Sequence, residues 1–321
     1  MTLKQLKNSF LLLIAATIWG TAFVAQSVGM DYVEPFTFCF SRSIIGCMVL
    51  IPIIYLFGRK DKTSQKENTE KSDTSFLAKN RILILGGIAC GICLFAASNL
   101  QQFGIMTSTA GKAGFITACY IIIVPVLGIF LKRKTSPLIW LGVVIALVGM
   151  FFLCIMPSIK NDGGFSFQPG DIQLILCSIC FSFHILVIDH FSPKTNGIKL
   201  SCIQFLVCGI LSGICMLIFE TPSMENILNA WLPIMYAGAM SSGIAFTLQI
   251  IAQKDLHPTV ASLIMSLESV ISVLAGFVIL NEVLSTYEII GCVLMFIAII
   301  LAQISPSDTS TANTEATKKS Y

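Results

Sequence analysis

The chain has 321 residues, of which 55% are hydrophobic and only 12% are charged, and its net charge is +3. A soluble globular domain carries about 25% charged residues, so the composition excludes a soluble domain. It also excludes disordered, coiled-coil, collagen-like and disulfide-rich secreted chains. Because the few charges are spread over loops, they form no basic face of the kind that binds nucleic acid. The class that remains is a polytopic membrane protein, whose partner is the lipid bilayer.

Ten apolar runs follow one another along the chain, and each is close to the length of about 20 residues that a helix needs to cross a bilayer. The sequence therefore predicts an all-α integral membrane protein with ten transmembrane helices. The charged stretch 58–80 and the tail 305–321 show no apolar periodicity and are predicted to be disordered. The ten predicted spans are Phe10–Val28, Phe36–Phe57, Ile82–Phe103, Ala110–Leu131, Leu138–Met156, Ile172–Phe191, Leu200–Phe219, Trp231–Gln253, Thr259–Leu280 and Tyr287–Ile304.

Lys and Arg residues set the predicted orientation, because loops on the cytoplasmic side of a membrane are rich in both. If the N-terminus lies inside, nearly all of the 20 Lys and Arg residues fall in inside segments, whereas the outside loops hold only Lys160. The N-terminus and the tail 305–321 are therefore predicted to be cytoplasmic, in a protein of the cytoplasmic membrane.

The second half of the chain resembles the first half, since residues 235–304 align with residues 87–155. Each half, 1–156 and 171–304, holds five predicted spans. Because five is an odd number, the two halves enter the membrane from opposite sides. Such inverted repeats are typical of secondary transporters, whose substrate site lies near the membrane midplane between the repeats.

Short motifs occur at defined places within the predicted spans. They are Trp19-Gly20-Thr21, Arg42, residues 109–116, His184, residues 202–205, Leu248-Gln249 with Gln253, and residues 261–268 followed by Asn281-Glu282. With these motifs the chain resembles the EamA-like family of the drug/metabolite transporter superfamily over essentially all ten spans. The resemblance implies a ten-helix carrier of small organic solutes, often an exporter of amino acids or related metabolites, with vitamins and drugs as further candidates. The family often has a proline after the glutamate of its ninth span, whereas this chain has Ser269, so no kink is implied there.

Glu268 is the first candidate for a coupling or substrate-binding residue, because it lies near the middle of a predicted span. A charged side chain at that depth costs about 3 kcal/mol, so the carboxyl group needs a reason to be there. It is a proton-coupling site, a ligand for a substrate amine, or a structural hydrogen-bond acceptor, and the sequence leaves these open. We expect it to face a central cavity, where protonation relieves the loss of hydration. Candidate hydrogen-bond donors are Gln249, Tyr120 and His184.

Aromatic and imidazole side chains near the midplane are further candidates. Tyr120 aligns with Glu268 between the halves and offers an aromatic wall with a hydroxyl group, although an ordinary interior aromatic is the slightly more common case. Trp19 lies in the middle of its span, away from the interface that Trp prefers, which favours cavity lining. His184 is either a proton relay or, more commonly for a lone histidine, a partner in a helix–helix hydrogen bond.

Amides and cations complete the set of candidates. Gln249 and Gln253 share a helix face, and Gln101 aligns with Gln249 between the halves; these amides line a polar pathway or tie helices together. Lys112, near the outer end of its span, either attracts an anionic solute, pairs with an acid such as Glu282, or reaches the interface with its long side chain. For Arg42 we expect the last of these, snorkelling to the outer interface.

The alternative function is an intramembrane enzyme that acts on a lipid or a small solute and is built around His184 and Glu268. The sequence offers it no second acid–base pair and no metal-ligand spacing, so we expect no enzyme. The C-x-x-C pairs Cys90/Cys93 and Cys177/Cys180 lie in apolar runs and are predicted to fill helix contacts. No Walker A motif occurs, and no cofactor or metal is expected. The predicted partners are a small-molecule substrate and the bilayer, and a monomer is compatible with the sequence.

Overall fold

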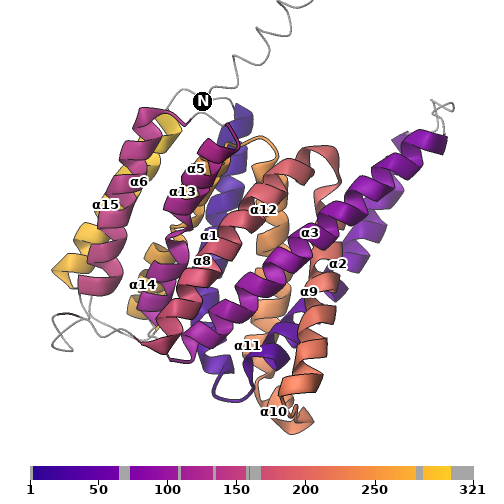
Figure 1. Ribbon diagram of the computed structural model, residues 1–321, viewed down its shortest axis with the longest axis horizontal. Coiled ribbons are helices and arrows are strands. Elements are labelled where there is room, and N and C mark those ends of the chain that lie inside the picture. Colours follow the sequence, from indigo (N-terminus) through magenta and orange to yellow (C-terminus); the bar gives the residue numbers. More distant parts are fainter. Residues whose placement is uncertain are drawn as a thin grey trace, which may run out of the picture.

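The computed structural model describes residues 3–64, 73–107, 110–132, 135–156, 159, 168–279 and 285–304. Every element in these ranges is a helix, and they contain no strand. The helices pack side by side as one bundle, in which the long helices run roughly alongside one another (Figure 1). This agrees with the all-α class predicted from composition.

The helices of the first half are α1 (Leu3–Gly29), α2 (Pro35–Ser64), α3 (Asp73–Ile105), α4 (Ala110–Ala118), α5 (Tyr120–Phe130), α6 (Pro137–Met150) and the π-helical turn η1 (Phe151–Ile155). Those of the second half are α8 (Pro169–Phe191), η2 (Ser192–Lys194), α9 (Gly197–Phe219), α10 (Met224–Asn229), α11 (Trp231–Met235), the π-helix η3 (Tyr236–Ala245), α12 (Phe246–Gln253), α13 (Pro258–Met265), α14 (Glu268–Ile279) and α15 (Thr286–Ile304). The short helix α10 has no counterpart among the predicted elements.

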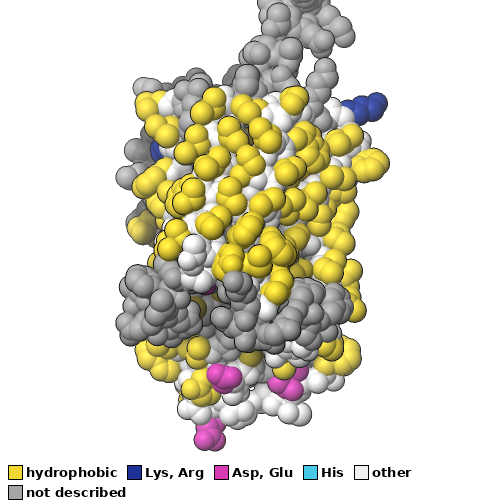
Figure 2. Space-filling view, turned by 90° about the vertical axis from the view of Figure 1, so that its left-hand side faces the viewer, with side chains coloured by type: hydrophobic (Ala, Val, Ile, Leu, Met, Phe, Trp, Pro, Cys, Tyr) yellow, Lys and Arg dark blue, Asp and Glu magenta, His cyan; other side chains and the backbone are white. Residues whose placement is uncertain are grey.

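The lengths and compositions of these helices suit a bilayer. Among the described residues, eight helical segments are long and apolar enough to cross a membrane, and two shorter apolar helices, Pro137–Leu153 and Thr286–Ala302, lie where the fifth and tenth spans are predicted. Figure 2 shows a broad hydrophobic surface, with acidic side chains near its lower end and Lys or Arg side chains near its upper end. The chain is therefore a multi-pass integral membrane protein.

Helices α2 and α3 extend beyond their apolar segments, so the prediction that 58–80 is a disordered loop is wrong at both ends. The backbone stays helical to Ser64 in α2 and is helical again from Asp73 in α3, while residues 65–72 lie outside the described part. Lengthening an existing helix is far easier than nucleating one, and the Lys and Arg residues in the extended part of α2 are good helix formers. Hydropathy shows where a helix leaves the hydrocarbon, and the helix itself continues past that point.

Two of the predicted spans are interrupted near their middles. The fourth span breaks at Cys119 into α4 and α5, and the ninth breaks at Ser266 and Leu267 into α13 and α14. The second break forms although Ser269 replaces the family's proline. At both points a backbone N–H bonds to the carbonyl three residues earlier, with N···O distances of 3.2 Å for Cys119 to Ile116 and for Leu267 to Ile264. Such 3₁₀-type tightening inside a helix is typical of hinges and functional sites.

Small residues allow helices to approach closely, as is usual in membrane bundles. The short helices α6 and α15 pack together at one edge (Figure 1), where Gly149 faces Gly291 so closely that a Cβ on either would meet the other's backbone. A Cβ at Gly20 of α1 would lie 2.6 Å from the carbonyl oxygen of Glu268, so α1 passes directly over the start of α14. The predicted filler Cys90 is fully buried among the apolar side chains of Ile188, Leu200 and Ile250.

Candidate functional site

A cavity lies within the helix bundle, and side chains from both halves of the chain line it. The space inside it, with part of its mouth, is about 480 Å³. The lining residues are Trp19, Phe23, Gln26, Arg42, Gln101, Thr117, Tyr120, Phe181, Ile185, Ser241, Phe246, Gln249, Met265 and Glu268.

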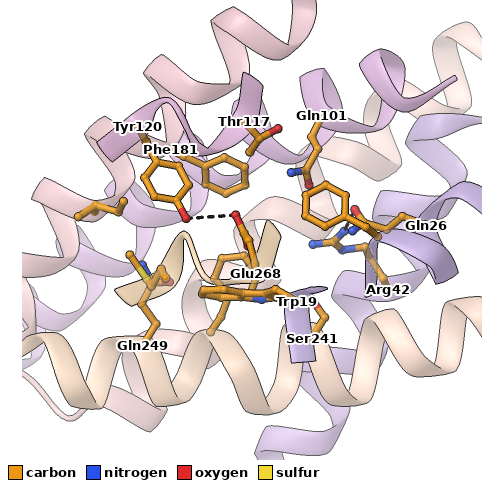
Figure 3. A pocket seen from close by; sticks show the side chains of 14 residues that line it. Trp19, Gln26, Arg42, Gln101, Thr117, Tyr120, Phe181, Ser241, Gln249 and Glu268 are labelled. Carbon is orange, nitrogen blue, oxygen red and sulfur yellow. Dashed lines mark hydrogen bonds between the residues drawn. The ribbon is translucent and has the colours of Figure 1, made fainter. Parts of the chain in front are cut away.

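Tyr120 and Glu268 meet in this cavity. The hydroxyl of Tyr120 donates a hydrogen bond to Oε1 of Glu268 over 3.1 Å (Figure 3). Both residues are buried, with exposed fractions of 4% for Tyr120 and 6% for Glu268. Tyr120 is the first residue of α5 and Glu268 is the first residue of α14, so both follow directly on a helix break. Tyr120 is one of the three donors that the sequence offers for Glu268, and it is the one that forms the hydrogen bond in the structure.

Trp19 forms one wall of the cavity beside Glu268 (Figure 3). Its ring packs edge-on against Phe246, with the ring centroids 4.8 Å apart. The indole Nε1 is buried and has no hydrogen-bond partner among the described residues. Trp19 directly precedes Gly20, the point at which α1 passes closely over the start of α14. Trp19 therefore lines a cavity, as its unusual depth suggests.

The amide candidates divide between cavity and scaffold. Gln249 and Gln101 line the cavity, and Oε1 of Gln249 is buried without a partner in the described part of the chain. Gln253 instead donates from Nε2 to the backbone oxygen of Ile185 over 3.4 Å, which ties α12 to α8. Gln253 therefore ties two helices together, whereas Gln249 and Gln101 face the cavity.

His184 is fully buried but is not among the residues that line the cavity. Its Nε2 lies 3.1 Å from Oε1 of Gln204 in α9, and its ring packs edge-on against Phe181 and Phe246. The structure therefore gives His184 the helix–helix hydrogen bond that is the commoner role of a lone buried histidine. The side chains of Lys112 and Glu282 lie outside the described residues, so their predicted alternatives stay open.

Arg42, like Gln26, Thr117 and Ser241, lines the cavity but was not predicted to do so from the sequence. It is only 3% exposed, it lines the cavity, and its Nη1 donates to Oε1 of Gln26 over 3.0 Å. The prediction that Arg42 snorkels to the outer interface is therefore wrong. The position of Gln26 could have suggested this placement, because Gln26 lies close to the short turn that joins α1 to α2. Helical side chains lean toward the N-terminus of their helix, so Arg42 leans toward that turn and reaches Gln26.

Comparison with known proteins gives relatives along the whole chain. The model of the EamA-like transporter family matches residues 6–155 and 168–303. An uncharacterized transporter of Archaeoglobus fulgidus is 27% identical over 94% of this chain and 87% of its own length. The uncharacterized transporter YoaV of Bacillus subtilis is 22% identical over 87% of this chain and 90% of its own length.

Comparison with solved structures supports the same fold. One structure, titled "Crystal structure of protein", matches with a TM-score of 0.71 at 20% identity and covers 93% of this chain and 98% of its own. At that identity the likeness shows the fold alone. The family model, in contrast, matches nearly the whole sequence, and its two matched segments together hold every residue that lines the cavity. The chain belongs to the EamA-like transporter family.

Proposed function

We propose that this protein is a secondary active transporter that moves a small organic solute across the cytoplasmic membrane by alternating access, with Glu268 as its proton-coupling residue. The observation that carries the proposal is the hydrogen bond between Tyr120 and Glu268 inside a cavity of the membrane-embedded bundle. The family often transports amino acids or related metabolites, so these solutes are the first to test, followed by vitamins and drugs.

The architecture that goes with this function is ten spans in two inverted repeats, 1–156 and 171–304. Two features support it. The family model matches the chain as two consecutive segments, and α4/α5 and α13/α14 break directly before the aligned residues Tyr120 and Glu268. A repeat interface near the midplane is where secondary transporters place their substrate sites.

Coupling follows from how water reaches the carboxyl group. Among the described residues, the Glu268 carboxyl receives one hydrogen bond, from Tyr120. The remaining acceptor sites depend on water, which a charged carboxylate needs and a protonated one needs less. If the cavity is wet in one conformation and dry in the other, Glu268 takes up a proton on one side and releases it on the other. Proton movement then drives solute movement in exchange.

Proteoliposomes test the function. Purified protein is reconstituted, and the flux of labelled amino acids, related metabolites and vitamins is measured with and without a pH gradient. We expect at least one solute to move faster with the gradient, and a protonophore to remove the difference. Flux that ignores the gradient would overturn coupling, and the absence of flux for the whole panel, with conversion of a solute to a product, would overturn transport.

Thiol labelling tests the orientation. The proposal places both chain termini and the segment 58–80 in the cytoplasm, because the inside segments hold nearly all the Lys and Arg residues. A cysteine introduced at Ser64 should resist an impermeant maleimide added to intact cells and react after the cells are opened. Labelling of intact cells above the background of the unsubstituted protein would show that this segment lies outside the cell and would overturn the proposed orientation.

The enzyme alternative finds no support in the site. It requires His184 and Glu268 to act together, but His184 bonds to Gln204 and does not line the cavity that holds Glu268. The family and its relatives named as transporters point the same way.

A further inference from the structure

We propose that the transported solute carries a carboxylate group, and that Arg42 binds it at the end of the cavity away from Tyr120. This inference rests on the proposed function, since it specifies the chemistry of the same cavity. Figure 3 shows the arrangement: Arg42 and Gln26 lie together on one side, Tyr120 lies on the other, and the carboxyl group of Glu268 is directed toward Tyr120.

The first argument is the uncompensated charge of Arg42. A guanidinium group stays protonated at any physiological pH, and this one is only 3% exposed. Within the described residues Arg42 forms no ion pair, and its hydrogen-bond acceptor is the neutral amide oxygen of Gln26, 3.0 Å away. A buried cation without an anion is unfavourable inside a membrane protein, and such residues usually face a binding site or pathway.

Two acidic side chains of this part of the bundle, Glu220 and Glu268, already have hydrogen-bond partners. The carboxylate of Glu220 caps the start of α2, where it accepts hydrogen bonds of 2.7 Å from the backbone N–H groups of Phe36 and Thr37 and from the Thr37 hydroxyl. Glu268 accepts from Tyr120. Among the described residues no carboxylate pairs with Arg42, so the guanidinium is free to bind the anionic group of a solute in the cavity.

The second argument is that Arg42 is held in place for a ligand. The Gln26 side chain is oriented because its Nε2 donates to the backbone oxygen of Ala22 over 3.3 Å, which leaves Oε1 to accept from Arg42. The backbone oxygen of Gln26 in turn accepts from Nε2 of Gln102 in α3 over 3.1 Å. One Arg42 nitrogen is thus fixed, and the planar guanidinium keeps donors that match the two oxygens of a carboxylate.

The rest of the cavity defines the body of the solute. Trp19, Phe23, Phe246 and Met265 give the rest of the cavity a large apolar wall, and the polar side chains of Gln101, Thr117, Ser241, Gln249 and Glu268 line it as well. A carboxylate with a compact hydrocarbon body fits this distribution, because its charged end meets Arg42 and its apolar end meets the aromatic wall.

Equilibrium binding to the full-length protein in detergent tests the inference without any gradient. Replacing Trp140 and Trp231 by Phe leaves Trp19 as the single tryptophan, and its fluorescence reports occupancy of the cavity. The probes are 4-methylpentanoate, 4-methylpentanamide and 4-methylpentylamine, which share a branched hydrocarbon body and carry negative, zero and positive charge. We expect the carboxylate to bind at least about tenfold more tightly than the amide or the amine.

The variants assign the selectivity to Arg42. We expect Arg42→Gln to weaken binding of the carboxylate at least about 30-fold and to leave binding of the amide nearly unchanged. Arg42→Lys keeps the charge but loses the planar fork, so it should fall between the two. Lys199→Gln removes an exposed cation remote from the cavity and serves as the matched control.

Each outcome bears on the inference. Equal affinity for carboxylate and amide, or no fluorescence change with any probe, overturns it. Selectivity that survives in Arg42→Gln overturns the role of Arg42. If Arg42→Gln does not fold, the affinities of the three probes for the protein that retains Arg42 and for Arg42→Lys still test whether Arg42 binds the carboxylate. Gradient-driven flux without carboxylate selectivity would remove this inference alone, and carboxylate selectivity without flux would remove the transport function alone.

Discussion

Two neighbouring helices, α4/α5 and α13/α14, are interrupted in nearly the same way. Each break contains a residue with ψ close to −10°: Cys119, one residue before Tyr120, has φ −58° and ψ −9°, and Ser266, two residues before Glu268, has φ −63° and ψ −10°. The two parts of each broken helix pack against the opposite parts of the other: α14, the second part of its helix, contacts α4, and α13, the first part, contacts α5. The two backbones therefore present the residue after each break to a common space.

The difference between them lies in the side chain presented. The first helix presents Tyr120, a neutral hydrogen-bond donor, and the second presents Glu268, an ionisable acceptor. Neither break needs a proline, because a side chain bonds back to the preceding turn: the Ser266 hydroxyl donates to Leu263 O over 2.8 Å, and the Cys119 thiol donates to Phe115 O over 3.5 Å. Shared backbone geometry thus fixes the position, and one residue on each helix sets the chemistry.

The largest effect that separates the two helices is expected from Glu268→Gln. Glutamine keeps the shape and cannot exchange a proton, so gradient-driven flux in proteoliposomes should be abolished while solute exchange at equal pH is largely retained. Glu225→Gln, at an exposed position on α10, is the matched control. Loss of both activities would point to a structural or direct-ligand role for Glu268, and unchanged gradient-driven flux would remove it from the mechanism.

Gly20→Ala and Gly114→Ala test how tightly neighbouring helices pack at the two breaks. A Cβ at Gly20 would meet the Glu268 carbonyl oxygen at 2.6 Å, whereas a Cβ at Gly114 of α4 would meet only the Ser269 hydroxyl at 3.9 Å. Overpacking of this kind costs about 1–3 kcal/mol, so Gly20→Ala should lower the midpoint of thermal unfolding in detergent and Gly114→Ala should not. Equal shifts for the two variants would show that α1 does not press on the start of α14.

Tyr120→Phe removes the donor and leaves the acid. A hydrogen bond contributes about 0.5–1.5 kcal/mol, and 1.4 kcal/mol corresponds to a tenfold change. Gradient-driven flux should therefore fall by up to about tenfold without being abolished. Tyr32→Phe, in the turn between α1 and α2, controls for loss of a hydroxyl elsewhere. A loss as complete as that of Glu268→Gln would mean that the two residues act as one unit.

The smallest effects are expected at the breaks themselves. Ser266→Ala removes a hydroxyl hydrogen bond and should destabilise the protein by about 1 kcal/mol, and Cys119→Ala should cost less because a thiol is a weak donor. Thermal unfolding of both variants in the same detergent measures the difference. A larger loss at Cys119 would show that the thiol has a role beyond its hydrogen bond to Phe115.

The sequence was a good guide to where helices lie and a poor guide to which way they face. The sixth predicted span, Ile172–Phe191, differs from α8 by three residues at one end, because hydropathy follows the thickness of the hydrocarbon layer. Arg42 and His184 were harder, because a helix that is apolar all round gives no amphipathic stripe to orient it. Their rotation depends on tertiary contacts such as Gln26 to Arg42 and Gln204 to His184.

The same reasoning explains the residues that were placed correctly. Glu268 could be assigned to an interior cavity from sequence because a carboxyl group facing lipid is too unfavourable. Its partner Tyr120 was one of several donors, and nothing in a single sequence ranks them. The break before Glu268 was not implied once Ser269 stood in place of proline, because the bond from Ser266 back to Leu263 depends on a rotamer that composition does not reveal.

The helical continuation of α2 to Ser64 and of α3 from Asp73 has a practical consequence for imaging. A bundle of 321 residues inside a micelle offers few features by which single particles can be aligned. Because both helices leave the bundle as continuous rods (Figure 1), a soluble helical protein spliced between Ser64 and Asp73 in register with both would inherit their direction. Such a fusion would serve as a rigid fiducial for electron cryo-microscopy, and it leaves every residue of the cavity unchanged.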